Sequence, residues 1–159
     1  MRRITPLMSS TLDPRAAVAA GLVASAGYVV AMEADLAITG HNADDLVFLG
    51  RPLVGRHRCW AKPAGFVVHL ANGAVLALVY ARFAHHRLPG PPWLRGIVFA
   101  NLENGILYPL TLLERHHPAI RDGQLDRYWH PLAFLQSIPR HIVYGAVLGG
   151  LYARWRNPT

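Results

Sequence analysis

The chain is poor in charge, has one cysteine and has a single lysine, and these shortages exclude several classes of protein. Only 16% of its 159 residues are charged and 52% are hydrophobic, whereas roughly a quarter of a soluble domain is charged. This composition excludes a disordered chain and argues against a water-soluble globule. Cys59 has no partner for an intramolecular disulfide or a cysteine-based metal site. The length fits one domain, which argues against separate cofactor and substrate modules.

Motifs of the common enzyme classes are also missing. The chain has no glycine-rich phosphate loop, no nucleophile elbow and no HExxH zinc motif. Fifteen of the sixteen basic residues are arginine, and they cluster between apolar segments instead of forming a stripe, which argues against nucleic acid as a partner. Enzymatic activity is therefore left open, and a non-enzymatic protein is favoured.

Four apolar segments dominate the chain. Each has about the 20 residues that a helix needs to cross a bilayer. They cover residues 16–38, 63–83, 93–113 and 131–153. The first two contain uncharged runs of 17 and 19 residues, and the other two carry one charge each, Glu103 and Arg140. The sequence therefore predicts an all-α membrane protein, with residues 1–159 forming one bundle of four transmembrane helices.

The start of the chain allows two interpretations. Met1-Arg2-Arg3 before an apolar run, with Ala24-Ser25-Ala26 inside it, resembles a cleaved signal peptide. The run continues to full spanning length, which favours a membrane helix. With both termini in the cytoplasm, inner segments carry eight basic residues and outer loops carry seven, so the positive-inside rule favours this orientation by a small margin. We expect a multi-pass protein of a bacterial inner membrane.

An internal repeat relates the second and fourth segments. At an offset of 72 residues, HLANGAVLALVYAR (69–82) aligns with HIVYGAVLGGLYAR (141–154), and eight of fourteen positions are identical. The first and third segments align more weakly, through Gly21-Leu22-Val23 and Gly96-Ile97-Val98. The pattern predicts a duplicated two-helix hairpin whose copies have the same orientation in the membrane.

Small residues at helical spacing predict where helices pack. Gly73 and Ala77 share one face of the second segment, and Gly145 and Gly149 share one face of the fourth. Small residues let helices approach closely in lipid, so we expect the second and fourth helices to pack through these positions.

The last segment carries the motif HxxYGxxxGxxY, and the second carries a His-x-x-Asn-Gly version of it. In these two helices the chain resembles small uncharacterised four-helix bacterial membrane proteins. The resemblance implies a fold and a membrane location, and it implies no activity or catalytic residue. Arg140, directly before the motif histidine, departs from the pattern, because a neutral residue is expected there.

Polar residues within the apolar segments are the candidate functional residues, because burying them in lipid is costly unless they are paired or hydrated. Counting along the helices places them together in the outer half of the bundle. The sequence therefore predicts an outward-facing polar pocket. Its residues are Glu33, His69, Asn72, Glu103, Asn104, Tyr108, Arg140 and His141.

Two interpretations of the ionisable members stay open. Glu33, His69, Glu103 and His141 could form a metal or proton site, since bundles build such centres from carboxylates and imidazoles on facing helices. The plainer alternative pairs Glu103 with Arg140 and Glu33 with His69, only to make their burial tolerable.

The leading hypothesis is a non-enzymatic binding or interaction module. Its partners are the lipid bilayer and either a second copy of the chain or another membrane protein. The alternatives are a membrane-embedded metal or haem redox protein and a small oligomeric transporter or channel. His69 and His141 could be the axial ligands of a haem, but close packing of their helices would leave little room for a porphyrin. The cofactor stays unknown.

Three further expectations concern residues near the helix ends. Residues 44–53 predict a short amphipathic helix on the outer surface. Asp35 lies close enough to the end of its helix to reach water and is assigned no role. The pairs His85-His86 and His116-His117 are expected to be solvated loop residues.

Overall fold

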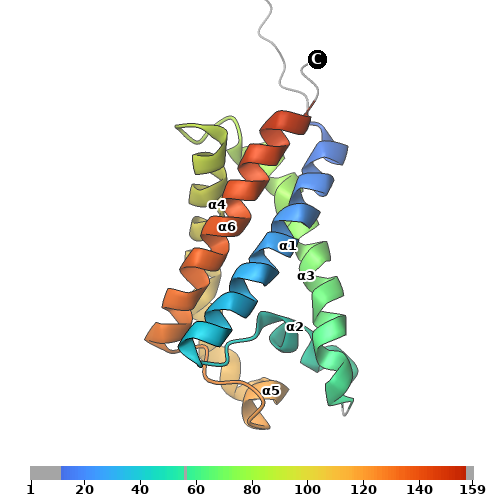
Figure 1. Ribbon diagram of the computed structural model, residues 1–159, viewed down its shortest axis with the longest axis vertical. Helices are drawn as coiled ribbons and strands as arrows, with labels where there is room; N and C mark the ends of the chain where they lie inside the picture. The colour runs from blue at the N-terminus through green and yellow to red at the C-terminus, as the bar shows by residue number, and fades with distance from the viewer. Residues whose placement is uncertain (1–11, 56, 157–159) are drawn as a thin grey trace, which may run out of the picture.

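The computed structural model describes residues 12–55 and 57–156, and all regular secondary structure in these ranges is helical. Four long helices run side by side, and two short helices lie at one end of them (Figure 1). The long helices are α1 (Pro14–Thr39), α3 (Ala61–Val79), α4 (Pro92–Leu107) and α6 (Pro131–Trp155). The short ones are α2 (Asp45–Val54) and α5 (Pro118–Arg121).

Two of the long helices continue with a different winding. A π-helical stretch, η2 (Tyr80–Ala84), extends α3, and a 3-10 stretch, η3 (Tyr108–His116), extends α4. A 3-10 turn, η1 (Arg58–Trp60), precedes α3. Each of the four apolar segments of the sequence therefore lies in a helix, with ends within a few residues of the predicted bounds.

Capping residues fix the turn from α1 into α2. Asp13 accepts a hydrogen bond of 3.0 Å from the Ala16 N–H at the start of α1. Gly40, with a φ of 68°, ends α1 in the left-handed conformation that glycine adopts without strain. Four residues later, the Asp44 side chain accepts hydrogen bonds from two N–H groups in the first turn of α2. The end of α1 is thereby held next to the start of α2.

Three helical segments are long and apolar enough to cross a membrane. They are Pro14–Thr39, Arg58–Ala84 and Pro92–His116. Large apolar side chains face outward from them, including Ile38 and Ile106, which are 83% and 73% exposed. Such exposure on many apolar residues is typical of a surface that contacts lipid. These features indicate a membrane protein. The fourth segment forms α6 with 25 residues, and it is not among these candidate spans.

The long helices follow one another in a row. α1 lies between α3 and α6, and α4 packs on the other side of α6. α3 and α4 are thus the two edges of the row, and they approach each other at η2, near the loop that joins them. The described ends of the chain, residues 12 and 156, lie at one end of the bundle, whereas α2 and α5 lie at the other (Figure 1).

The predicted packing of the second helix on the fourth is wrong, because the small residues of each helix pack on a different neighbour. Gly73 and Ala77 of α3 contact α1 at Gly21, where an added Cβ would lie 2.6 Å from the Ala77 Cβ and the Gly73 carbonyl oxygen. The small side chains of α1 therefore determine how closely α3 approaches.

On the other side of the bundle, Gly145 and Gly149 of α6 pack on α4. A Cβ added at Gly96 would lie 1.9 Å from the Gly145 carbonyl oxygen, and one added at Gly149 would lie 2.1 Å from the Pro92 carbonyl oxygen. At these distances backbone meets backbone, so only glycine allows the contact.

Candidate binding cavity

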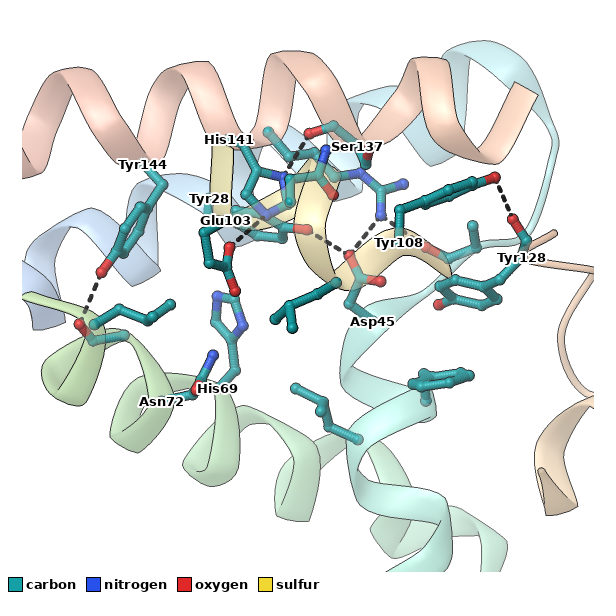
Figure 2. A pocket seen from close by; sticks show the side chains of 18 of the residues that line it. Tyr28, Asp45, His69, Asn72, Glu103, Tyr108, Tyr128, Ser137, His141 and Tyr144 are labelled. Carbon is teal, nitrogen blue, oxygen red and sulfur yellow. Dashed lines mark hydrogen bonds and ion pairs between the residues drawn. The ribbon is translucent and has the colours of Figure 1, made fainter. Parts of the chain in front are cut away.

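A cavity of about 220 Å³ lies among the long helices, with α2 at one end of it (Figure 2). Its wall is mostly apolar, and ionisable groups project into it from three long helices and from α2. Seven of the eight residues predicted for a pocket line this one cavity: His69, Asn72, Glu103, Asn104, Tyr108, Arg140 and His141.

Glu33 is the exception. Its carboxylate lies 2.6 Å from the Lys62 ammonium, and both side chains are nearly half exposed. The Lys62 ammonium also lies 2.9 Å from the Asp44 carboxylate. The predicted hydrogen bond between Glu33 and His69 is therefore wrong. Glu33 projects from α1 toward the start of α3, where the only lysine of the chain neutralises it.

The predicted pair of Glu103 and Arg140 is also wrong. Arg140 is 2% exposed, and its guanidinium group contacts two carboxylates of other helices. One amino group of the guanidinium donates to Asp35 at 2.6 Å, and the other donates to Asp45 at 2.7 Å. The length of the arginine side chain lets it reach the junction of α1 and α2, so it does not contact the carboxylate nearest in depth.

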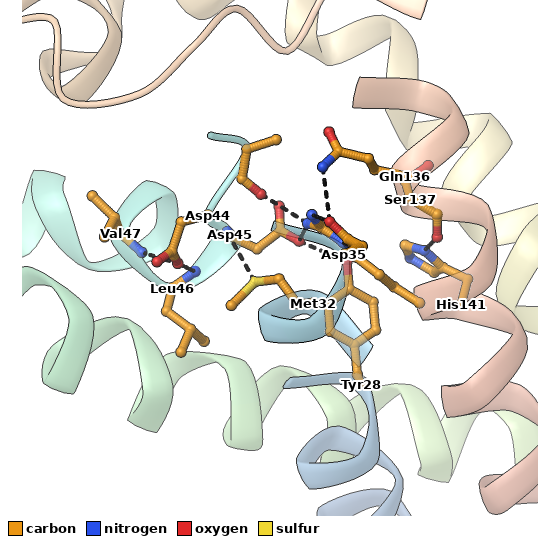
Figure 3. A network of polar contacts seen from close by, with 12 residues as sticks. Tyr28, Met32, Asp35, Asp44, Asp45, Leu46, Val47, Gln136, Ser137 and His141 are labelled. Atoms are coloured by element: carbon orange, nitrogen blue, oxygen red, sulfur yellow. Dashed lines mark hydrogen bonds and ion pairs between the residues drawn. The ribbon is translucent and has the colours of Figure 1, made fainter. Parts of the chain in front are cut away.

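Further hydrogen bonds complete this ion network (Figure 3). Arg140 also donates to the Ala43 carbonyl oxygen at 2.8 Å, and the Tyr28 hydroxyl donates to Asp45 at 2.7 Å. The Gln136 amide donates to Asp35 at 2.8 Å. The network joins α1, α2 and α6. Asp35 was assigned no role from the sequence, although an arginine in an apolar segment signals that a carboxylate partner must be near.

Glu103 faces His141 instead. The nearest carboxylate oxygen of Glu103 lies 3.6 Å from Nε2 of His141. Nδ1 of the same ring lies 2.7 Å from the Ser137 carbonyl oxygen. A carbonyl oxygen only accepts, so Nδ1 donates, and Nε2 of a neutral ring is then an acceptor. Within the described ranges Glu103 has no hydrogen bond, so its carboxylate is free to bind another molecule.

His69 approaches the cavity from α3. Its Nε2 atom is buried and has no hydrogen-bond partner in the part of the chain that the structure describes. The ring of Tyr28 contacts both cavity histidines, with centroid distances of 4.8 Å to His69 and 5.2 Å to His141. A porphyrin bound by both imidazoles would have to displace that tyrosine. The two histidines are thus near each other, but Tyr28 takes the space that a haem would need.

The predicted metal ligands do not assemble. Among residues 12–55 and 57–156, no three histidine, cysteine, aspartate or glutamate side chains are placed to hold a metal ion. Glu33 is paired with Lys62, which leaves Glu103 and the two histidines without a fourth ligand. The residues present do not fit a tetrahedral metal site.

The predicted surface helix at 44–53 forms as α2, and it closes one end of the cavity. A Cβ added at Gly50 would lie 1.8 Å from the Ala61 carbonyl oxygen, so α2 packs tightly on the start of α3. Phe48 of α2 lines the cavity and stacks on His117, with ring centroids 4.0 Å apart. The Tyr108 hydroxyl donates to the Tyr128 carbonyl oxygen at 2.7 Å. These contacts separate the cavity from the adjacent end of the bundle.

A second buried polar cluster lies at the opposite end. His85, which was expected to be solvated, is 2% exposed. Its Nδ1 lies 3.1 Å from the Tyr80 hydroxyl oxygen, and its ring packs edge-on against Tyr152. Burial, together with the nearby positive charges of Arg156, His86 and Arg95, lowers the pKa of His85 to about 4. The expectation failed because η2 turns the start of the loop inward.

Comparison with known proteins places the chain in a family without assigning an activity. No curated protein and no solved structure matches it. A family model does match, over residues 12–159, and its description is a family of unknown function, DUF6789. This match covers the helices, the cavity and the ion network. The chain therefore belongs to the DUF6789 family.

Proposed function

We propose that this chain is a non-enzymatic, multi-pass membrane protein that binds a small molecule in the cavity among its helices. The observation that carries the proposal is a cavity of about 220 Å³ in which polar groups lack a hydrogen-bond partner within the described ranges. Binding sites are typically apolar cavities with a few such groups to orient a ligand. The Glu103 carboxylate and Nε2 of His69 are groups of this kind.

We further propose that α6 is a fourth membrane-spanning helix. It has 25 residues and lies between α1 and α4, both of which belong to candidate spans. Its buried charge is paired, because Arg140 contacts Asp35 and Asp45. Pairing lowers the cost of placing a charged side chain in lipid.

A duplicated hairpin is part of the same proposal. The contact between Gly21 and Gly73 joins α1 to α3, and the contact between Gly96 and Gly145 joins α4 to α6. Gly73 aligns with Gly145 in the sequence repeat, and Gly21 aligns more weakly with Gly96, so each half of the bundle closes through corresponding glycines. We place the bundle in a bacterial inner membrane, with both termini in the cytoplasm.

Ligand binding is tested with three compact probes that share one apolar body: 1-adamantylamine, 1-adamantanol and 1-adamantanecarboxylate. The melting temperature of the full chain in lipid nanodiscs is measured with each probe. Leu76 lines the cavity, so Leu76→Trp fills it. Val75 is 57% exposed, so Val75→Trp adds the same side chain outside it.

We expect at least one probe to raise the melting temperature of the wild type and of Val75→Trp, and not that of Leu76→Trp. The control separates binding in the cavity from partitioning into lipid, which acts on all three proteins alike. If no probe stabilises the wild type more than Leu76→Trp, the binding proposal is wrong.

A further inference from the structure

We infer that the ligand of this cavity is a lipid-soluble amine, with an apolar body and a protonated nitrogen, that enters from the bilayer between α3 and α4. The inference rests on the proposed binding function and adds the chemical class of the ligand. Three observations carry it: the position of the cavity mouth, the charge of the wall, and the pair of facing acceptor atoms on Glu103 and His141.

The mouth of the cavity lies at membrane depth. Most lining residues are buried or half-buried, but Asn72 of α3 and Leu107 of α4 are exposed. Asn72 lies near the middle of Arg58–Ala84, and Leu107 lies within the central part of Pro92–His116. These helices are the two edges of the row, and side chains of both contribute to the wall. Because α2 closes the cavity toward its own end of the bundle, a ligand reaches the mouth through the hydrocarbon core.

The charged groups of the wall favour a cation. Asp45 and Glu103 line the cavity, and Arg140 is the positively charged side chain among the lining residues. Arg140 pairs with both Asp45 and Asp35, so its single positive charge already faces two negative charges. Glu103 adds a third carboxylate. A cationic ligand beside Glu103 would reduce this excess negative charge, whereas an anion would increase it.

The geometry around Glu103 fits a ligand that donates hydrogen bonds. The carboxylate and Nε2 of His141 are 3.6 Å apart, too far for a hydrogen bond between them. With Nδ1 donating to Ser137, both facing atoms are acceptors when the ring is neutral. An ammonium group placed at these two atoms can donate to both of them. Nearby aromatic rings, including those of Tyr28 and Tyr144, favour a cation further through their faces.

Arg140 offers an anionic ligand little to bind, because four of its five N–H donors are used within the protein. Its Nε and one amino group contact Asp35, and the other amino group donates to Ala43 and Asp45. The guanidinium group therefore binds mainly acceptors of the protein itself. The apolar remainder of the wall, which includes Leu49 and Leu76, suits a hydrocarbon body.

The ligand class is tested by comparing the three adamantyl probes on matched variants. Glu103→Gln removes the charge of the Glu103 carboxylate and keeps the shape of its side chain, whereas Glu33→Gln removes a carboxylate outside the cavity. We expect the amine to bind the wild type at least tenfold more tightly than the alcohol or the carboxylate does. Glu103→Gln should remove this preference, and Glu33→Gln should retain it. Apparent affinities come from the dependence of melting temperature on probe concentration.

The outcomes separate this inference from the binding proposal. If the alcohol or the carboxylate stabilises the wild type as strongly as the amine and Leu76→Trp abolishes the effect, the cavity binds ligands but the amine inference is wrong. The amine inference is also wrong if Glu103→Gln keeps the preference for the amine. If Glu103→Gln fails to fold, the comparison of the three probes on the wild type alone still tests the preference for the amine.

The route of entry has its own test. Spin labels are attached at Asn72→Cys and Leu107→Cys in a Cys59→Ser background, and their relaxation by oxygen, which concentrates in lipid, is compared with relaxation by a water-soluble nickel chelate. We expect oxygen to dominate at both positions. Stronger relaxation by the nickel chelate would place the mouth in water and overturn entry from the bilayer.

Discussion

Arg140 shows how one charged side chain organises a whole end of the bundle. Its guanidinium group uses its donors on two carboxylates and a backbone carbonyl, and Tyr28 and Gln136 donate to the same carboxylates. A buried ion pair gives little net stability by itself, but removing one partner leaves an uncompensated charge. The arginine is therefore required because the two aspartates are present.

We expect Arg140→Met to destabilise the protein strongly, because Asp35 and Asp45 would face each other without a cation. Breaking a buried ion pair typically costs about 3 to 5 kcal/mol. Adding Asp45→Asn to Arg140→Met should recover part of the loss. Melting temperatures of both single variants and of the double variant in one detergent give the coupling.

The exposed pair of Lys62 and Glu33 is the control for this double-mutant cycle. Both side chains are nearly half exposed, and pairs of this kind contribute about 1 kcal/mol or less. Glu33→Gln should therefore lower the melting temperature only slightly, because Lys62 keeps its contact with Asp44. Purely additive losses for Arg140→Met and Asp45→Asn would show that the two residues do not interact.

His85 gives the protein a stability that depends on pH. The unfolded chain takes up a proton on this ring near its ordinary pKa of about 6.5, whereas burial holds the folded-state pKa at about 4. The unfolded state thus binds more protons between these values, so stability is complete above the higher pKa and falls as pH drops toward the lower one. The loss is at most about 1.4 kcal/mol per pH unit.

His85→Asn, which keeps a polar group near Tyr80 but does not titrate, should reduce this dependence. Melting temperatures at pH 7 and pH 5 measure it, and the difference between wild type and variant removes the contributions of the other histidines. If the melting temperature falls equally between pH 7 and pH 5 in the wild type and in His85→Asn, the pKa of His85 is the same in the folded and unfolded states.

At the scale of the helix, glycine positions decide which helices meet. Gly96 contacts the backbone of α6, so we expect Gly96→Ala to separate α4 from α6 and to lower the melting temperature markedly. Gly105 of the same helix has nothing within 4 Å of its would-be Cβ. Gly105→Ala should be neutral or should stabilise the helix by about 0.5 to 1 kcal/mol. Equal losses in the two variants would contradict the role of Gly96.

The helices were predictable from the sequence because each depends on a local property. Apolar length places each helix within a few residues of its position in the structure. Helix pairing was not predictable in the same way. The spacing of small residues indicated that Gly73 and Gly145 lie at close contacts, which they do. A face of small residues does not, however, specify the helix that packs on it.

The candidate cavity was predictable for a similar reason. Depth along a helix follows from counting residues, and this placed His69, Glu103 and His141 in the same half of the bundle. The ion pairs depend on side-chain direction and reach. Arg140 extends toward the end of the bundle, where Asp35 and Asp45 lie, and depth alone pointed to Glu103 instead.

At the scale of the whole molecule, the two ends of the bundle differ in how their cations are neutralised. At the end with α2 and α5, Arg51, Arg58 and Arg127 form ion pairs with carboxylates. Among the described residues, the arginines of the other end, 15, 82, 87, 95, 154 and 156, belong to none of the observed ion pairs. The positive-inside rule counts basic residues and gives carboxylates little weight, so the proposed orientation rests on the count of basic residues and needs a direct test.

Cys59 tests this orientation. It is an exposed residue of η1, just before α3. We expect a membrane-impermeant maleimide to label it in intact bacterial spheroplasts, because this end should face outward. Cys59→Ser is the control for background labelling. Labelling that appears only after the membrane is broken would invert the orientation and leave the helix arrangement unchanged.

The ion network also makes the two halves of the chain specific for each other. Asp35 and Asp45 come from the first half and Arg140 from the second, whereas the loop before α4 is the covalent link between the edge helices. The protein should therefore tolerate a break at Gly90 when residues 1–89 and 90–159 are expressed together. The fragments should copurify from membranes, and Arg140→Met in the second fragment should prevent it. The buried charges therefore provide pairing specificity, which lets one half of the chain associate with the other half among the many apolar helices of a membrane.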